Sequence, residues 1–332
     1  MTILLPKDRL PTDRHARHGR LRDYFCDKDA TATEVDGMWR LELGWPAGIE
    51  RHVDPRIVDE LIAWDGIGLG GMAMARRRSG RVLTALYDTW TLPSWTEWVA
   101  RAGVPSDEPI TILHLDDHRD LGSPRLSITD AGLVDLITGK SFDIRDPDSV
   151  LASCASGAVG MGSFLTPFLR AFPNCDVRQL GQAPKITATE DYSVVQDIHA
   201  DDLLRPGAQR PAVRLDPLSD GGTGPGRYRA TADLADWLAD IGPGPVLLHV
   251  DMDYFNNRYD GDGDWPDRVR RHDPPLDIVL AKVDAVAAAM RSAGLVERIQ
   301  DAVVAFSPGF FPAEMWQPAE LRLRDGLAEL YG

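Results

Sequence analysis

The chain has 332 residues, of which 43% are hydrophobic and 26% are charged. These fractions are close to the averages of globular proteins, and they exclude a disordered, collagenous or coiled-coil chain. Length alone allows one large domain or two, and we start from one. The formal net charge of −15 disfavours nucleic acid as a partner, because phosphate backbones are also negative. A surplus of acidic groups suits cationic ligands, although solubility is its commonest meaning.

Cysteine content and hydropathy indicate the cellular compartment in which the protein is expected. The three cysteines, Cys26, Cys154 and Cys175, are too few and too scattered for a disulfide framework, and none forms a CxxC pair. The segment MTILLPKDRLPTDRH holds only a short apolar run before proline and charges, so we expect no signal peptide. Eighteen apolar residues nowhere run together, so we expect no membrane span. These features predict a cytoplasmic protein.

Residues 1–50 are rich in Arg, Asp and Pro, and their apolar patches have no clear period. This pattern predicts an irregular extension or a small accessory layer. A single larger domain is expected over residues 51–332.

The rest of the chain alternates between two patterns. Short β-branched runs bounded by Gly, Pro or charge are typical of buried parallel strands. They occupy residues 81–88, 110–116, 246–255 and 302–307. Helices are expected over residues 231–242, 275–294 and, as one or two pieces, 312–332. The alternation predicts an α/β fold, a mainly parallel sheet between helices, with ligands at the carboxyl ends of the strands.

The first acidic strand end is HLDDHRD, residues 114–120. Alternate residues of this run would share one face if the strand continued, because side chains of a strand alternate between its two faces. These residues are His114, Asp116, His118 and Asp120.

The second acidic strand end is HVDMDYF, which by the same rule places His249, Asp251 and Asp253 on one face. Carboxylates pressed together raise one another's pKa values unless cations neutralise them. Either motif alone is explained equally well by carboxylates that cap loops, but the two together favour a divalent metal. Oxygen-rich sites with one or two imidazoles suit ions such as Mn²⁺, and two aspartates that can bridge favour a pair of ions. Such a pair lowers the pKa of a bridging water from about 15.7 toward about 7, which makes hydrolysis the expected reaction class.

Both motifs resemble those of the arginase (ureohydrolase) superfamily, whose members use a binuclear manganese site. Asp116-x-His118-x-Asp120 is similar to the DAHxD motif, and Asp251-x-Asp253 to the later DxD motif. The resemblance implies that Asp116 and Asp251 bridge two Mn²⁺ ions, that Asp120 binds one ion, and that His118 and Asp253 bind the other.

The residue sequences of four segments are similar to those found in one branch of arginase relatives. These segments are HLDDHRDL, GSFLTPFL (162–169), HVDMDYF and SPGFF (307–311). The branch includes peptide arginases, which convert arginine side chains of ribosomally made peptides into ornithine. The resemblance covers roughly residues 80–320.

One family ligand has no direct counterpart. Family members supply a His from an earlier strand, but no His lies between His52 and His114. Asp88 stands in the corresponding region, LYDTWTLPSW, and we predict it as the replacement ligand; the alternative is a turn residue at a strand end. His114 and His249 lie one strand repeat before the ligands, and we expect them to pack behind the site or to orient its ligands.

The catalytic groups are less complete. Arginases carry a proton-shuttling His soon after the first motif, but the segment after Asp120 has none, and spacing selects neither His199 nor His272. A guanidinium needs a carboxylate, because two parallel charge-assisted hydrogen bonds suit its fork. Glu314 is the candidate, with a carboxylate at a helix start as the alternative. Asp120 and Glu314 are therefore the predicted catalytic residues.

The resemblance implies hydrolysis of peptidyl arginine to ornithine and urea, with an arginine-containing precursor peptide as partner. A small-molecule ureohydrolase is the near alternative. A metal-dependent deacetylase is disfavoured, because such relatives usually keep one metal and lack the second Asp of each pair. A binding protein that keeps the fold without catalysis is also open, given the missing histidines. A dinucleotide cofactor is not expected, since the GxGxxG pattern at 66–71 follows a helical segment instead of a strand.

Overall fold

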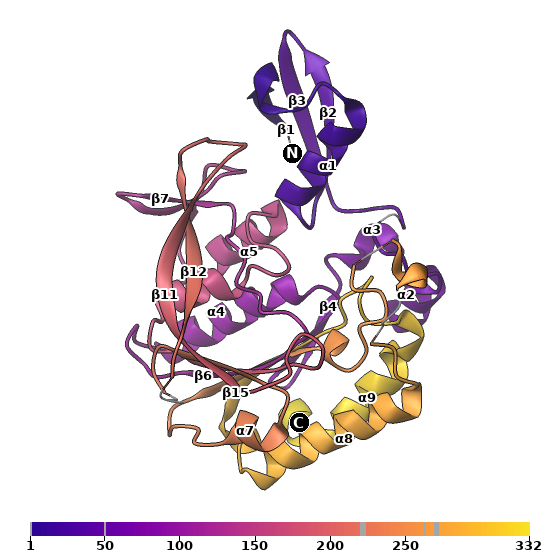
Figure 1. The fold of residues 1–332 in the computed structure, drawn as a ribbon, viewed down its shortest axis with the longest axis vertical. Helices are drawn as coiled ribbons and strands as arrows, with labels where there is room; N and C mark the ends of the chain where they lie inside the picture. Colours follow the sequence, from indigo (N-terminus) through magenta and orange to yellow (C-terminus); the bar gives the residue numbers. More distant parts are fainter. Residues whose placement is uncertain (1, 50, 220–223, 262, 269–271) are drawn as a thin grey trace.

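The computed structural model describes residues 2–49, 51–219, 224–261, 263–268 and 272–332, and within them it has the predicted α/β architecture (Figure 1). A nine-stranded sheet runs through the molecule. Its strands are β4 (Arg76–Ser79), β5 (Val82–Ala85), β6 (Thr111–Leu115), β10 (Asp176–Leu180), β11 (Glu190–Ala200), β12 (Gln209–Pro217), β13 (Arg227–Thr231), β14 (Val246–Asp251) and β15 (Ile299–Ala305). Their order in space is β12-β11-β13-β10-β6-β14-β15-β5-β4.

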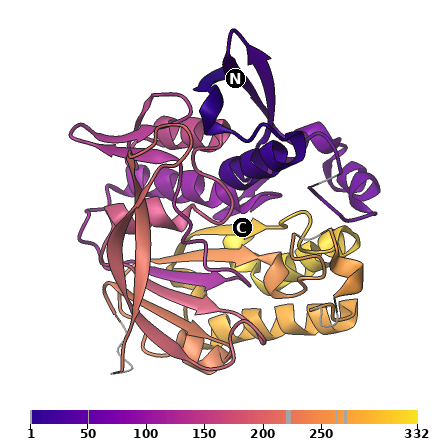
Figure 2. The ribbon, with the colours of Figure 1, turned by 45° about the horizontal axis from the view of Figure 1, so that its top comes forward.

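The centre of this sheet is parallel, as predicted. The strands from β13 to β5 in the spatial order run parallel to one another. The β11–β12 hairpin and β4 join them antiparallel at the two edges. A parallel sheet must be covered on both faces. Figures 1 and 2 place α4 (Thr91–Ala102) and α5 (Pro147–Ser156) on one face, and α8 (Leu276–Ser292) and α9 (Trp316–Gly326) on the other. The molecule is thus a three-layer α/β/α structure.

The amino-terminal residues have regular structure. Three antiparallel strands form a small sheet in the order β1-β3-β2. They are β1 (Thr2–Pro6), β2 (Asp29–Val35) and β3 (Met38–Gly44). Helix α1 (Arg14–Phe25) packs against β2 and begins at Asp13, whose side chain accepts a hydrogen bond from the Ala16 amide at 2.8 Å. Tyr24 ties this layer to the main body, since its hydroxyl donates to Asp201 at 2.6 Å.

The remaining elements are short. They are β7 (Leu126–Thr129), β8 (Gly132–Asp135), β9 (Ser141–Phe142), α2 (Ile57–Asp65), α3 (Leu69–Met72), α6 (Leu165–Ala171), α7 (Leu234–Leu238) and α10 (Ala328–Tyr331). Strands β7, β8 and β9 form a third sheet. None of the described helices has the length and apolar character needed to cross a membrane.

Several expected elements are shorter than their patterns suggested, among them the strand expected over 81–88, which is β5 alone. The expected helix over 231–242 is α7 alone, because Asp233 caps it by accepting from the amides of Ala235 and Asp236. The expected strand over 246–255 ends at Asp251, after which the chain makes a 3₁₀ turn. Glu50, at the expected domain boundary, lies outside the described residues.

Candidate metal centre

Four neighbouring strands bring the predicted ligands to one edge of the sheet. In space these strands follow the order β6-β14-β15-β5, and all run parallel. Asp116 follows β6, Asp251 ends β14, Ser307 follows β15 and Asp88 follows β5. Because the carboxyl ends of parallel strands meet at the same edge, residues almost two hundred positions apart in sequence become neighbours.

Local turns, and not a continued strand, bring the residues of each motif together. Strand β6 ends at Leu115, so the expected alternation along one strand face does not extend through the first motif. Asp116 Oδ1 instead accepts a hydrogen bond from the His118 amide at 2.6 Å. Asp251 Oδ1 accepts from the Asp253 amide at 3.1 Å in the same way. An aspartate that bonds the amide two residues ahead reverses the chain, which explains physically why both motifs have the same spacing.

Asp116 belongs to two groups of metal-binding atoms. In the first group the ligand atoms of His114, Asp116, Asp120 and His249 lie within 4.8 Å of one another, and all four residues are buried. In the second group the ligand atoms of Asp116, His118 and Asp253 also lie within 4.8 Å of one another; Asp116 and Asp253 are buried, and His118 is partly exposed. The structure therefore contains a buried His/Asp cluster that could hold a metal ion.

His114 and His249 lie closer to the ligands than the sequence indicated. They are paired in the register of β6 and β14, and their rings stack with centroids 5.0 Å apart. His114 Nε2 is 3.6 Å from Asp116 Oδ2, and His249 Nε2 has no hydrogen-bond partner. Burial lowers the pKa of His114 to about 4 and that of His249 well below its ordinary value. Both imidazoles are therefore neutral at physiological pH, which is the form that binds metals.

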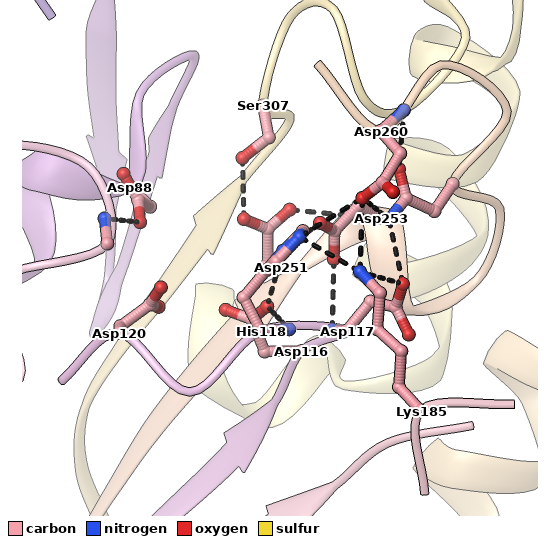
Figure 3. A network of polar contacts seen from close by, with 12 residues as sticks. Asp88, Asp116, Asp117, His118, Asp120, Lys185, Asp251, Asp253, Asp260 and Ser307 are labelled. Carbon is pink, nitrogen blue, oxygen red and sulfur yellow. Dashed lines mark hydrogen bonds and ion pairs between the residues drawn. The ribbon is translucent and has the colours of Figure 1, made fainter. Parts of the chain in front are cut away.

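A cavity of about 270 Å³ lies beside the cluster. Its lining includes five of the six predicted metal ligands, namely Asp88, His118, Asp120, Asp251 and Asp253. In Figure 3, Asp88 and Asp120 lie to one side of Asp251, while Asp260 and Lys185 lie to the other. The amino-terminal layer also lines the cavity, through Arg22, Cys26 and Asp27. The segment that precedes α2 lines it through Arg51 and His52.

Asp88 and Asp251 line the cavity but belong to neither of the two ligand groups. Asp88 Oδ2 accepts a hydrogen bond from the Gly162 amide at 3.4 Å, and its Oδ1 has no partner. Asp251 Oδ2 accepts from the Ser307 hydroxyl at 2.5 Å. Whether these two carboxylates bind an ion, as the sequence suggests, stays a prediction.

The carboxylates of the centre are buried and repel one another. Burial is the main cause that raises the pKa values of Asp88, Asp116, Asp120 and Asp251 well above their ordinary value, and neighbouring carboxylates add to it. Oxygen atoms of Asp88, Asp116 and Asp120 have no hydrogen-bond partner among the described residues. Buried polar atoms are normally paired, so these oxygens are suited to bind a cation. Carboxylates with imidazoles are also the donor set that suits Mn²⁺.

A third acidic group beside His118 already holds a cation of the chain itself. Lys185 Nζ lies 2.8 Å from Asp117 and 3.0 Å from Asp260. Its ammonium occupies the centre of this group, so we assign no metal there. Sequence reasoning missed Lys185, which is far from both motifs and has no spacing that marks it.

Glu314 lies apart from the cavity. Its carboxylate accepts from Arg258 NH1 at 2.5 Å, in a salt bridge at the start of the carboxyl-terminal helices. It is not among the residues that line the cavity, so its position does not suit the predicted contact with a guanidinium. The helix-start alternative describes this residue better.

The structure also places the histidines. His199 is exposed on β11, and His272 contacts Gln182; neither lines the cavity. His52 does line it, with Nδ1 3.1 Å from the Pro308 carbonyl and Nε2 3.1 Å from the Tyr87 hydroxyl. Nothing in the spacing of the sequence selects His52.

Ser307 is expected to orient Asp251. Its backbone has a φ of +41°, a conformation that costs energy outside glycine, and its hydroxyl reaches the Asp251 carboxylate. A hydrogen bond to a ligand fixes the orientation of that ligand, and its removal typically weakens metal binding about 10 to 100-fold. We therefore expect Ser307→Ala to weaken Mn²⁺ binding by that amount, measured by competition with a fluorescent chelator. Ser94→Ala is the matched control, because Ser94 also donates a hydrogen bond of 2.5 Å to an aspartate, Asp301, which lies away from the site. Equal Mn²⁺ affinities for the two variants would contradict this role.

Comparison with models of protein families found no match for this chain, and comparison with curated proteins found none either. The candidate metal centre is therefore assigned from the chemistry and positions of its own residues.

Proposed function

We propose that the chain is a binuclear Mn²⁺ hydrolase that cleaves the guanidinium of peptidyl arginine to give ornithine and urea. The observation that carries the proposal is that Asp116 belongs to both groups of side chains that could hold a metal ion, and that other members of these groups line the cavity. A carboxylate shared in this way is suited to bridge two ions. The resemblance to arginases assigned the same partition, with Asp120 on one side of Asp116, and His118 and Asp253 on the other.

The residues of the chain would divide the work as follows. Asp116 would contact both ions, and Asp120 would hold the first ion together with imidazole nitrogen from His114 or His249. His118 and Asp253, whose Nδ1 and Oδ2 atoms lie 2.9 Å apart, would hold the second. Asp251 and Asp88 would complete the set from the cavity wall. Two Mn²⁺ ions would supply an activated water and a positive charge that stabilises the transition state.

Arginine within a peptide is the substrate that the resemblance favours. The cavity is lined both by buried carboxylates and by the exposed Arg22, so it communicates with the surface. An arginine side chain could extend into it while the peptide backbone stays outside. A precursor peptide would then be the partner, and the cytoplasm would be the compartment of the reaction.

The experiment combines metal content with urea release. The purified protein is loaded with Mn²⁺ and desalted, and its Mn²⁺ content is measured by elemental analysis. Urea is then assayed with acetyl-Gly-Arg-Gly-amide and with free arginine. We expect two Mn²⁺ per chain and urea from the peptide. Urea from free arginine alone would favour the small-molecule ureohydrolase, and a metal-free protein without urea release would contradict the hydrolase.

A further inference from the structure

Asp27 is a buried carboxylate of the amino-terminal layer that reaches the candidate centre. It follows α1, lines the cavity and is only 2% exposed. Its Oδ2 accepts hydrogen bonds from Thr89 Oγ1 at 3.0 Å and from the Met161 amide at 2.8 Å. Its Oδ1 is buried and has no hydrogen-bond partner among the residues that the structure describes. The hydrogen bonds to Oδ2 thus fix the side chain, while Oδ1 is available to accept a hydrogen bond from a ligand that enters the cavity.

Asp27 stands beside Asp88. The consecutive amides of Met161 and Gly162 donate to Asp27 and to Asp88 respectively, and Thr89, which binds Asp27, directly follows Asp88 in the chain. The two carboxylates are therefore held by the same two segments of chain. Asp27 is nevertheless absent from the described groups of side chains that could hold a metal ion.

Within the described part of the chain, no cationic side chain pairs with the free oxygen of Asp27. Burial raises the pKa of Asp27, and the hydrogen bonds from Met161 and Thr89 oppose this rise. Arg51 also lines the cavity, but its guanidinium donates to Asp29 at 2.7 Å and to the Lys28 carbonyl at 2.6 Å. A buried carboxylate is costly unless it is paired. A cation that enters the cavity would complete it.

We propose that Asp27 is the carboxylate that recognises the substrate, and that its Oδ1 accepts a hydrogen bond from the guanidinium of an arginine side chain. The inference rests on the proposed function for the identity of the cation, and it gives Asp27 the role that the sequence assigned to Glu314. It also gives the amino-terminal layer a function, because α1 and the loop after it carry this residue into the cavity of the main domain.

The first test compares a charged peptide with its neutral counterpart. Acetyl-Gly-Arg-Gly-amide and the same peptide with citrulline have nearly the same shape, but only the first carries a guanidinium. Binding is measured by calorimetry in EDTA, where no turnover takes place. We expect the wild-type protein to prefer the arginine peptide by at least about tenfold, as a charge-assisted hydrogen bond implies. Asp27→Asn, which keeps the shape and can still accept from Thr89 and Met161, should lose this preference. Asp23→Asn, at an exposed position of α1, should retain it.

A second variant displaces Asp27 without removing its charge. A Cβ atom at Gly160 would lie 2.7 Å from Asp27 Oδ2, so Gly160→Ala must move the carboxylate. We expect this variant to weaken arginine-peptide binding in the same direction as Asp27→Asn. An unchanged preference in both variants, or no binding of the arginine peptide by the wild-type protein, would overturn the inference.

Metal content and turnover separate this inference from the proposed function. With Mn²⁺ bound, Asp27→Asn should keep the metal content of the wild type and raise KM for the arginine peptide more than it lowers kcat. Loss of Mn²⁺ in Asp27→Asn would make Asp27 a ligand and overturn the inference. Binding that depends on Asp27 without any urea release would refute the hydrolase but leave the recognition site. Urea release with an unchanged KM in Asp27→Asn would support the hydrolase but refute the recognition site.

Discussion

Replacement of Asp251 by asparagine is expected to abolish stoichiometric Mn²⁺ binding and to lower urea release from an arginine peptide at least about a thousandfold, equivalent to about 4 kcal/mol of transition-state stabilisation. Asp251 ends β14 beside Asp116, lines the cavity and is held by Ser307. Asparagine keeps the shape of the side chain but loses the negative charge and one acceptor oxygen. Elemental analysis and a urea assay on the same sample measure both effects.

Asp301→Asn is the matched control for this prediction. Asp301 is also buried, lies on the neighbouring strand β15 and accepts a hydrogen bond of 2.5 Å from a serine, Ser94. It lies outside the cavity lining, so its replacement should leave the Mn²⁺ content unchanged. Near-ultraviolet circular dichroism would check that both variants are folded. Full Mn²⁺ content in folded Asp251→Asn would contradict its role as a ligand.

The second large effect that we expect is a dependence of the free energy of unfolding on both metal and pH. In EDTA, the stability of the protein should fall as the pH rises through the pKa values of the clustered carboxylates, because burial raises these values well above those of the unfolded chain. A carboxyl whose folded pKa is raised favours the folded state at low pH, and that contribution is lost as the pH rises through the folded pKa. Buried histidines such as His52, with a pKa lowered to about 4, have the opposite sign, because their contribution to stability is lost as the pH falls toward about 4.

Mn²⁺ should reverse this trend. Carboxylates bound to an ion release their protons, so binding strengthens as the pH rises. Free Mn²⁺ at 100 times its dissociation constant should stabilise the fold by about 2.7 kcal/mol for each independent site. Urea denaturation in EDTA and in Mn²⁺, at several pH values, measures the effect. Asp120→Asn removes one buried carboxylate and should flatten the pH dependence in EDTA. Denaturation curves that coincide with and without Mn²⁺ would contradict a metal centre.

The elements nearest the site were the ones that the sequence indicated best. Strands β5, β6, β14 and β15 are buried runs of β-branched residues, and their boundaries stand out against the charged segments that follow them. The parallel sheet then requires that their carboxyl ends meet, which is why sequence alone could place Asp116 and Asp251 near each other. The edge strands were harder to find. Strand β11, for example, is half exposed, and its alternation is weak.

The side chains that sequence reasoning missed are joined by tertiary contacts alone. Asp27 reaches the cavity because α1 docks on the main domain, and Lys185 lies between two acidic loops; no periodic pattern encodes either contact. His114 and His249 were placed too far from the ligands, because the loop after β6 folds back over His114, whose Nε2 lies 3.2 Å from the His118 carbonyl. Glu314 lies outside the cavity lining, and the sequence could not place it, because a carboxylate after a strand fits a substrate contact and a salt bridge equally well.

The central claim is that two Mn²⁺ ions share Asp116. Electron paramagnetic resonance of the Mn²⁺-loaded protein, with its metal content measured on the same sample, tests this claim most directly. We predict two Mn²⁺ per chain with the signal of an exchange-coupled pair, and loss of that coupling in Asp116→Asn. A single uncoupled Mn²⁺ in the wild-type protein, or none, would contradict it.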